Sequence, residues 1–222
     1  MNEKVDAFNK VADVYDDWYR HPQGRQVFNA ERDAVNSMIP PEGVGLEIGS
    51  GTGAFAESLE DHRRVIVGLD PSVEMLSRAV EKKTHNVLGY GNYAPFRSIF
   101  DFSYMVTVIE FLDNPVETLT EIKGICKADA SLTLMFINGR SPWGAFYREI
   151  GSKGDPVFKH ARLYELDEIK ELFHKAGYRI ITVKGTLSSE PTNPKVDYKL
   201  VSPSDSAGVI VVKGVPRSSI FS

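Results

Sequence analysis

"LEIGSGTGAF" occupies residues 46–55, and the expected fold class follows from this stretch. A short apolar strand pattern leads into glycines at alternate positions, Gly49, Gly51 and Gly53. Glycine adopts backbone angles that are closed to other residues and leaves room for a ligand against the main chain. This composition favours a binding loop of an α/β fold, although a tight turn between a strand and a helix could show the same pattern.

Strand-like and helix-like patterns alternate along most of the chain. The strand patterns are VGLEIG, RRVIVGLD, NVLGYG, FDFSYMVTVI and SLTLMFIN, and helical patterns lie between several of them. Such alternation predicts a parallel sheet with helices on both faces. RIITVKGTL and AGVIVVKGV are separated by a long loop, which favours antiparallel pairing. We therefore expect an α/β fold with a Rossmann-like, doubly wound, mostly parallel seven-stranded sheet and an antiparallel last strand.

The length of 222 residues favours one sizeable core, so we expect a single domain over residues 1–222. Residues 1–40 are predicted to form an N-terminal helical cap. Within this cap, residues 3–20 place aromatic side chains at the intervals of one helix, and a second helical pattern follows. Residues 141–165 interrupt the alternation after the fifth strand pattern, and we expect an insertion there, over one end of the sheet.

The composition argues against several classes of function. A net charge of -4 and a pI near 5.8 provide no basic face, so no nucleic-acid partner is expected. No apolar run reaches the roughly 18 to 20 residues of a membrane span, so no membrane partner is expected either. Cys126, the only cysteine, ends a helical pattern; we expect a buried structural thiol and a cytoplasmic location. No metal-binding motif is present.

Asp70 ends the second strand pattern, about twenty residues after the glycines. A carboxylate at this position can accept hydrogen bonds from both hydroxyl groups of a ribose that lies across the end of the sheet. Asp70 could instead cap the helix that follows, a role that Ser72 could fill as well. Together, the glycine loop and Asp70 favour a ligand that contains a nucleoside.

The spacing of Gly49, Gly51 and Ala54 also matches the dinucleotide fingerprint, so an NAD-binding oxidoreductase is an alternative. Glu47 argues against NAD, because it lies two residues before the first glycine, where dinucleotide folds prefer an apolar residue. An acid at that position can reach a cationic amine. In addition, no second half with its own nucleotide-binding pattern follows.

Three further stretches extend the pattern: VGLDPSVEMLSRA (residues 67–79), FDFSYMVTVIEFLDNPVETLTEI (residues 100–122) and KHARLYELDEIKELFHKAGY (residues 159–178). With the glycine stretch, they resemble the class I S-adenosylmethionine-dependent methyltransferases. The resemblance is to the small-molecule enzymes related to the ubiquinone/menaquinone C-methyltransferases in particular. It covers roughly residues 8–178 and implies S-adenosylmethionine as the cofactor and S-adenosylhomocysteine as the product.

The resemblance also implies a set of cofactor-binding residues. The glycine loop would pass beneath the methionine part of the cofactor, with Glu47 near its ammonium group. Asp70 would hold the ribose, and the residues that follow it would line the adenine. The implied set is Tyr15, Glu47, Gly49, Ser50, Gly51, Asp70, Pro71, Met75, Asn92, Val106 and Thr107.

The expected substrate is a small molecule, and its candidate contacts come from the cap and from residues 141–165. Aromatic rings stack on aromatic ligands and cations pair with carboxylates, so this composition suggests an aromatic or anionic molecule. A solvated lid packed by its own aromatic residues would have the same composition. The predicted substrate-binding residues are Trp18, Tyr19, Trp143, Tyr147 and Arg162.

His160 is the candidate for a catalytic base, because the pKa of a free histidine lies near neutrality. Many relatives carry Glu-His after the fourth strand, whereas this chain has Glu110 and Phe111. Alignment of the reacting groups can supply about 7 to 11 kcal/mol, more than the roughly 3 to 5 kcal/mol from a general base, so a missing base does not exclude methyl transfer. A non-catalytic protein that binds S-adenosylmethionine is a second alternative.

Overall fold

A seven-stranded sheet forms the centre of the computed structural model, which describes residues 2–193 and 195–217. The strand order is β3-β2-β1-β4-β5-β7-β6. Strands β1 to β5 pair in parallel, and β7 runs antiparallel to both β5 and β6, which confirms the predicted sheet. The strands are β1 (Gly43–Ile48), β2 (Arg64–Asp70), β3 (His85–Leu88), β4 (Phe100–Val106), β5 (Cys126–Ile137), β6 (Tyr178–Thr186) and β7 (Val209–Pro216).

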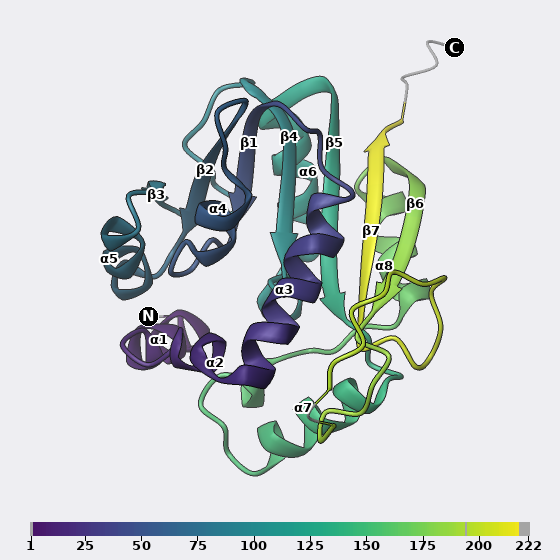
Figure 1. Cartoon of the computed structure of the whole chain (residues 1–222). Helices are drawn as coiled ribbons and strands as arrows, with labels where there is room; N and C mark the ends of the chain where they lie inside the picture. The colour runs from purple at the N-terminus through teal and green to yellow at the C-terminus, as the bar shows by residue number, and fades with distance from the viewer. Residues whose placement is uncertain (1, 194, 218–222) are drawn as a thin grey trace.

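Helices cover both faces of this sheet. In Figure 1, α3 and α4 lie in front of the sheet and α6 and α8 lie behind it, while α1, α2 and α7 lie at the lower edge, where β4 and β5 end. No helix in the described part of the chain is both long enough and apolar enough to span a bilayer. The helices are α1 (Glu3–Val11), α2 (Asp17–Arg20), α3 (Pro22–Asn36), α4 (Ala54–Leu59), α5 (Val73–Glu81), η1 (Ile109–Phe111), α6 (Pro115–Ile125), α7 (Pro142–Ser152), η2 (Phe158–His160) and α8 (Leu166–Lys175).

The sheet separates two hydrophobic cores, because alternate side chains of each strand point to opposite faces. On the α6 and α8 side, Leu134 and Phe136 of β5 pack in one core with Phe173. On the α3 and α4 side, Met135 packs in the other core with Val27. Burial on both faces explains why the central strands read as nearly continuous apolar runs.

The predicted helix over residues 3–20 is wrong, because the chain forms two helices there. α1 ends at Val11, α2 begins at Asp17, and residues 12–16 form turns. The Asp16 carboxylate accepts hydrogen bonds from the Thr52 hydroxyl and the Lys82 amine, both at 2.7 Å. These tertiary contacts stabilise the turn between the two helices, although the local sequence pattern favours one continuous helix.

Cys126 also departs from its predicted element. It was expected at the end of a helix, but α6 ends at Ile125 and Cys126 is the first residue of β5. Its thiol is buried and free, as expected for a structural cysteine. Ser98 donates a hydrogen bond to the Cys126 carbonyl at 2.6 Å, which fastens the start of the strand.

Gly45 shows how closely β1 packs against its neighbour, and it gives a test of the fold. A Cβ atom at Gly45 would lie 2.4 Å from the ring of Phe102, whereas one at the exposed Gly124 of α6 would meet nothing within 4 Å. We expect Gly45→Ala to lower the free energy of unfolding by about 1–3 kcal/mol through overpacking. Gly124→Ala should raise it by about 0.5–1 kcal/mol, because alanine favours a helix.

Urea denaturation followed by circular dichroism measures both free energies. Equal stability of Gly45→Ala and the unmodified protein would contradict the packing described here.

Candidate functional site

A cavity of about 470 Å³ lies at the carboxyl ends of β1, β2 and β4. The last residues of these strands line it, including Ile48, Asp70 and Val106. From β1 the chain continues to β2 and β3 on one side and then returns to β4 on the other side, so the strand order reverses between β1 and β4. Ligands of open α/β sheets bind at such a switch point. Phe8 and Tyr15, from α1 and the turn after it, line the side of the cavity that the cap covers. The cavity is therefore placed where this fold holds its ligands.

The three glycines of the loop after β1 have different surroundings, although all have positive φ angles. A Cβ atom at Gly49 would lie 2.4 Å from the side chain of Val108, and one at Gly53 would lie 2.7 Å from the hydroxyl of Thr84. A Cβ atom at Gly51 would meet nothing within 4 Å. Gly49 and Gly53 therefore permit close packing inside the protein. Gly51 leaves its main chain open to the cavity.

Asp70 ends β2 at the wall of the cavity and is 7% exposed. Its two carboxylate oxygens accept hydrogen bonds from the backbone N–H groups of Gly51 and Ser72, both at 2.8 Å. Burial raises the pKa of Asp70 to about 6, and the two backbone hydrogen bonds oppose this rise. A carboxylate has about four lone-pair sites, so two remain for a ligand. Ser72 caps α5, because its hydroxyl accepts a hydrogen bond from the Met75 N–H at 3.1 Å.

Most of the predicted cofactor-binding residues are brought together around this cavity. They come from the α1–α2 turn, the glycine loop, the ends of β2 and β4, and the loop after β3. The predicted residues that line the cavity are Tyr15, Gly49, Gly51, Asp70, Pro71, Met75, Asn92, Val106 and Thr107.

Glu47 and Ser50, the other two predicted residues, do not line the cavity. Glu47 is 2% exposed, and its carboxylate accepts a hydrogen bond from the Tyr104 hydroxyl at 3.1 Å. Burial raises the pKa of Glu47 to about 8. The Ser50 hydroxyl is buried and has no hydrogen-bond partner in the described residues. Both side chains lie beneath the loop, and the role that the resemblance implied for each stays a prediction.

Thr107 lies in the cavity wall with a φ angle of 50°, which is rare for a residue other than glycine. Its N–H donates to the Met135 carbonyl at 3.0 Å, which holds this conformation where β4 ends. Backbone strain of this kind is found at functional sites, where the surrounding structure maintains it.

The α1–α2 turn is fastened to the glycine loop and to α5. Besides the Asp16 hydrogen bonds to Thr52 and Lys82, the Lys82 amine donates to the Thr52 carbonyl at 2.8 Å. The Asp16–Lys82 ion pair is only about one-fifth exposed. At the other end of α1, Lys4 pairs with Asp113 at 2.7 Å. These contacts hold the cap over the cavity.

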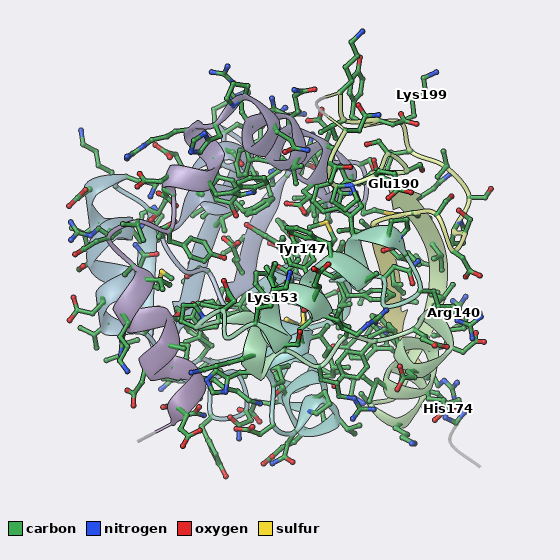
Figure 2. The ribbon with its side chains drawn as sticks, turned by 90° about the horizontal axis from the view of Figure 1, so that it is seen from below. Arg140, Tyr147, Lys153, His174, Glu190 and Lys199 are labelled. Atoms are coloured by element: carbon green, nitrogen blue, oxygen red, sulfur yellow. The ribbon has the colours of Figure 1, made fainter. Side chains whose placement is uncertain are left out.

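The predicted substrate-binding residues Trp18, Tyr19, Trp143 and Tyr147 do not line this cavity. Trp18 is 40% exposed, whereas Trp143 is buried and donates from its indole nitrogen to the Ser189 carbonyl at 2.8 Å. Tyr147 stacks on Phe158, with ring centroids 4.3 Å apart. Figure 2 shows Tyr147 near the middle of the molecule, whereas Arg140, His174 and Lys199 lie toward its edge.

His160 is the last residue of η2, and Arg162 follows two residues later. Neither residue lines the cavity. The Arg162 guanidinium lies over the Tyr164 ring and donates to the Glu168 carboxylate at 3.0 Å. The structure therefore does not bring the predicted base or the predicted cation to this cavity. Their proposed roles stay predictions.

Two aromatic and two acidic residues near the cavity were missed by the sequence analysis. Phe8 and Phe111 both line the cavity, and their ring centroids are 5.0 Å apart. Glu31 of α3 and Glu110 of η1 are 9% and 1% exposed. A sequence signal for Glu31 existed, because it lies four residues after Val27, on the buried face of its helix.

The buried acids predict how stability depends on pH. Burial raises the pKa of Glu31 and Glu47 to about 8 and that of Glu110 to about 7, while unfolded glutamates have a pKa near 4.3. Between about pH 5 and pH 8, the folded protein therefore binds more protons than the unfolded chain, and stability falls as the pH rises.

We expect Glu47→Gln to weaken this dependence by up to about 1.4 kcal/mol per pH unit, whereas Glu57→Gln, at an exposed position of α4, should leave it unchanged. Urea denaturation at several pH values measures the slope. A slope for Glu47→Gln as steep as that of the unmodified protein would argue against a neutral Glu47.

Comparisons with known proteins agree with this geometry. An uncharacterised protein from Methanocaldococcus jannaschii is 30% identical over 187 residues, which is 84% of this chain and 87% of that protein. A crystal structure from Thermotoga maritima, described as an S-adenosylmethionine-dependent methyltransferase and possible histamine N-methyltransferase, matches with a TM-score of 0.85. It is 28% identical, and the match covers 96% of this chain and 99% of that one.

Magnesium protoporphyrin IX methyltransferase from Synechocystis, solved with bound S-adenosylhomocysteine, shares the fold at 14% identity and a TM-score of 0.69. The match covers 98% of this chain and 100% of that one. The family model described as a methyltransferase domain matches residues 23–183. The fold implies S-adenosylmethionine as the cofactor. The chain belongs to the class I S-adenosylmethionine-dependent methyltransferases.

Proposed function

We propose that this protein transfers a methyl group from S-adenosylmethionine to a small molecule, with the cavity at the ends of β1, β2 and β4 as the cofactor site. The observation that carries the proposal is the open space at Gly51, which faces a 470 Å³ cavity beside the Asp70 carboxylate. A nucleoside needs both a close approach to the main chain and an acceptor for its ribose hydroxyls. The residues present therefore fit this cofactor.

Each part of the cavity has a proposed role. Asp70 would accept the ribose hydroxyls with its two remaining lone-pair sites, and Pro71, Met75 and Asn92 would contact the adenine. The open main chain at Gly51 would lie under the methionine part. When bound, S-adenosylmethionine supplies a methyl group on a positively charged sulfur.

The contribution of the chain to the reaction would be mainly positional. Thr107 is held in a strained conformation at the end of β4, and the turn that carries Tyr15 is fastened by the Asp16 contacts. A rigid wall of this kind can hold an acceptor in line with the methyl group, and such alignment can contribute about 7–11 kcal/mol. No base has to be assigned for this contribution.

Residues 1–40 would form the cap and residues 141–165 the substrate-side insertion of one methyltransferase domain over residues 1–222. The acceptor would be a small molecule with an aromatic part, because an aromatic ring from each segment approaches Phe111: its ring centroid lies 5.0 Å from that of Phe8 and 6.3 Å from that of Phe158. The description of the Thermotoga maritima relative as a possible histamine N-methyltransferase favours the same class.

The relation to the ubiquinone/menaquinone C-methyltransferases stays a prediction. An anionic acceptor has less support than an aromatic one, because two of the cations that suggested it form ion pairs within the protein. Lys153 pairs with Glu149, and Arg162 pairs with Glu168.

Titration calorimetry with S-adenosylhomocysteine and with NAD tests the proposed function directly. We expect saturable binding of S-adenosylhomocysteine and little heat from NAD. An NAD Kd about a hundredfold tighter, which is about 2.7 kcal/mol, would reject the methyltransferase proposal in favour of the oxidoreductase alternative.

Asp70→Ala is expected to weaken S-adenosylhomocysteine binding by about 1 kcal/mol or more, because the ribose loses charge-assisted hydrogen bonds. Asp61 is a matched control: it also accepts two backbone N–H groups, those of Arg63 and Arg64, but at the opposite end of β2. Asp61→Ala should therefore leave the affinity unchanged. Calorimetry on both folded variants compares the two Kd values, and an equal effect of both changes would remove Asp70 from the proposed site.

Gly51→Ala separates ligand contact from backbone strain. The new methyl group would project into open space at a φ angle of 54°, and Gly154, at 94°, has equally open surroundings away from the cavity. Both changes should cost similar stability, because alanine is disfavoured at positive φ. Only Gly51→Ala should weaken S-adenosylhomocysteine binding, by about tenfold or more.

Calorimetry gives the affinities of these two variants, and thermal unfolding gives their stabilities. Unchanged affinity in Gly51→Ala would show that the cofactor does not pass over this position.

A further inference from the structure

Two buried carboxylates, those of Glu31 and Glu110, form no ion pair within the described residues. Glu31 of α3 forms no hydrogen bond or ion pair within residues 2–193 and 195–217. Glu110 of η1 accepts a hydrogen bond from the Ile137 N–H at 2.7 Å with one oxygen, while its other oxygen, Oε2, is buried and has no partner in the same residues. Carboxyl groups that are buried without partners are costly, so this arrangement calls for an explanation.

Several aromatic side chains lie close enough to the two acids for their charges to act on the tyrosine hydroxyls. On the α1–α2 side, the centroids of Tyr15 and Tyr19 are 6.3 Å apart. On the α7 side, Tyr147 stacks on Phe158, which approaches Phe111. The charge of Glu31 raises the pKa of Tyr15, Tyr19 and Tyr147, after the larger effect of burial, and Glu110 also raises that of Tyr147. Coulombic effects fall off with distance, so the three phenol groups lie near Glu31, and Tyr147 lies near both acids.

This cluster adjoins the proposed cofactor site. Tyr15 belongs to both, because it lines the cavity and feels the charges of Glu31 and Asp70. Glu110 directly precedes Phe111, which lines the cavity, and follows Thr107 by three residues. A molecule held by the acids would therefore lie next to the end of β4, where the methyl group is expected.

The side chains of this cluster favour one class of ligand over others. A metal ion is disfavoured, because no group of three or more histidine, cysteine, aspartate or glutamate side chains that could hold one occurs in the described residues. An anion would be repelled by the two acids. An ammonium group offers up to three N–H donors to two carboxylates, and aromatic faces attract cations.

We propose that Glu31 and Glu110 bind the amino group of a small amine, which is the methyl acceptor and whose apolar part lies among the surrounding aromatic rings. This proposal rests on the methyltransferase function proposed above and adds to it the class of acceptor and the residues that hold it. Glu31, which has no other polar partner among the described residues, is the proton acceptor.

The transfer step balances with these groups alone. The bound ammonium gives one proton to the Glu31 carboxylate and becomes a neutral amine with a lone pair. That lone pair forms the N–C bond to the methyl carbon, while the electron pair of the C–S bond returns to sulfur. The products are the N-methylated ammonium ion and S-adenosylhomocysteine, with the abstracted proton on Glu31.

Calorimetry tests the ligand class with three amines as probes: 2-phenylethylamine, tyramine and histamine. The anionic counterpart is 3-phenylpropionate, and the neutral counterpart is 4-ethylphenol. Each probe is titrated with and without S-adenosylhomocysteine. We expect saturable binding of at least one amine with a Kd below about 1 mM, and at least tenfold weaker binding of both counterparts. Failure of all three amines to meet this limit, or equal binding of a counterpart, would overturn the proposal.

Variants test the two residues. Glu31→Gln and Glu110→Gln keep the side-chain size, and an amide oxygen at position 110 can still accept the Ile137 N–H. Both should weaken amine binding by about tenfold or more, because the charge-assisted hydrogen bonds are lost, and both should retain S-adenosylhomocysteine binding. Asp33→Asn, an exposed acid on the same helix, is the control and should change neither affinity.

The two proposals fail separately. If the amine affinity of both glutamine variants equals that of the unmodified protein, the amine site is refuted, whatever S-adenosylhomocysteine does. If the unmodified protein does not bind S-adenosylhomocysteine, the methyl-transfer function is refuted. The titrations without that ligand then judge the amine site by itself.

Discussion

The Asp70 carboxylate is the constraint on which the rest of the site depends. It accepts the N–H groups of Gly51 and Ser72, so one side chain at the end of β2 joins the glycine loop to the start of α5. The Leu69 carbonyl adds hydrogen bonds from the Gly49 and Ser50 N–H groups at 2.7 and 3.2 Å. The loop is therefore fastened at the sheet edge with its open side toward the cavity. Without these contacts, the space over Gly51 would have no defined shape.

Burial acts differently on the acids around the cavity, because their hydrogen bonds differ. Asp70 accepts two backbone N–H groups, and its pKa rises only to about 6. Glu31 accepts none within the described part of the chain, and burial raises its pKa to about 8. Similar carboxyl groups are thus suited to different tasks: Asp70 to an ionised acceptor of ribose hydroxyls, and Glu31 to a group that gains and loses a proton near neutrality.

The turn between α1 and α2 determines where Tyr15 lies relative to the acids around the cavity. The break between α1 and α2 puts Tyr15 in the wall of the cavity, where the charges of Glu31 and Asp70 act on it, and the Asp16–Lys82 ion pair holds the break in place. Residues 141–165 contribute Tyr147 and Phe158 from the other side. Figure 1 shows α1, α2 and α7, which come from segments far apart in the sequence, at the same edge of the sheet, where β4 and β5 end.

The sequence by itself determined the sheet and its antiparallel last strand, because local patterns encode them, and most of the residues that it predicted for a cofactor site line one cavity. Buried strands are apolar runs, and the loop glycines and Asp70 lie at the strand ends, so topology alone brings Gly51, Asp70 and Thr107 together. Only the tertiary structure decided where α1 ends, why Gly51 differs from Gly49 and Gly53, and that the charge of Glu110 acts on Glu31. Those features depend on contacts between distant segments, such as Asp16 with Lys82, and no local periodicity records which surface a buried acid will meet.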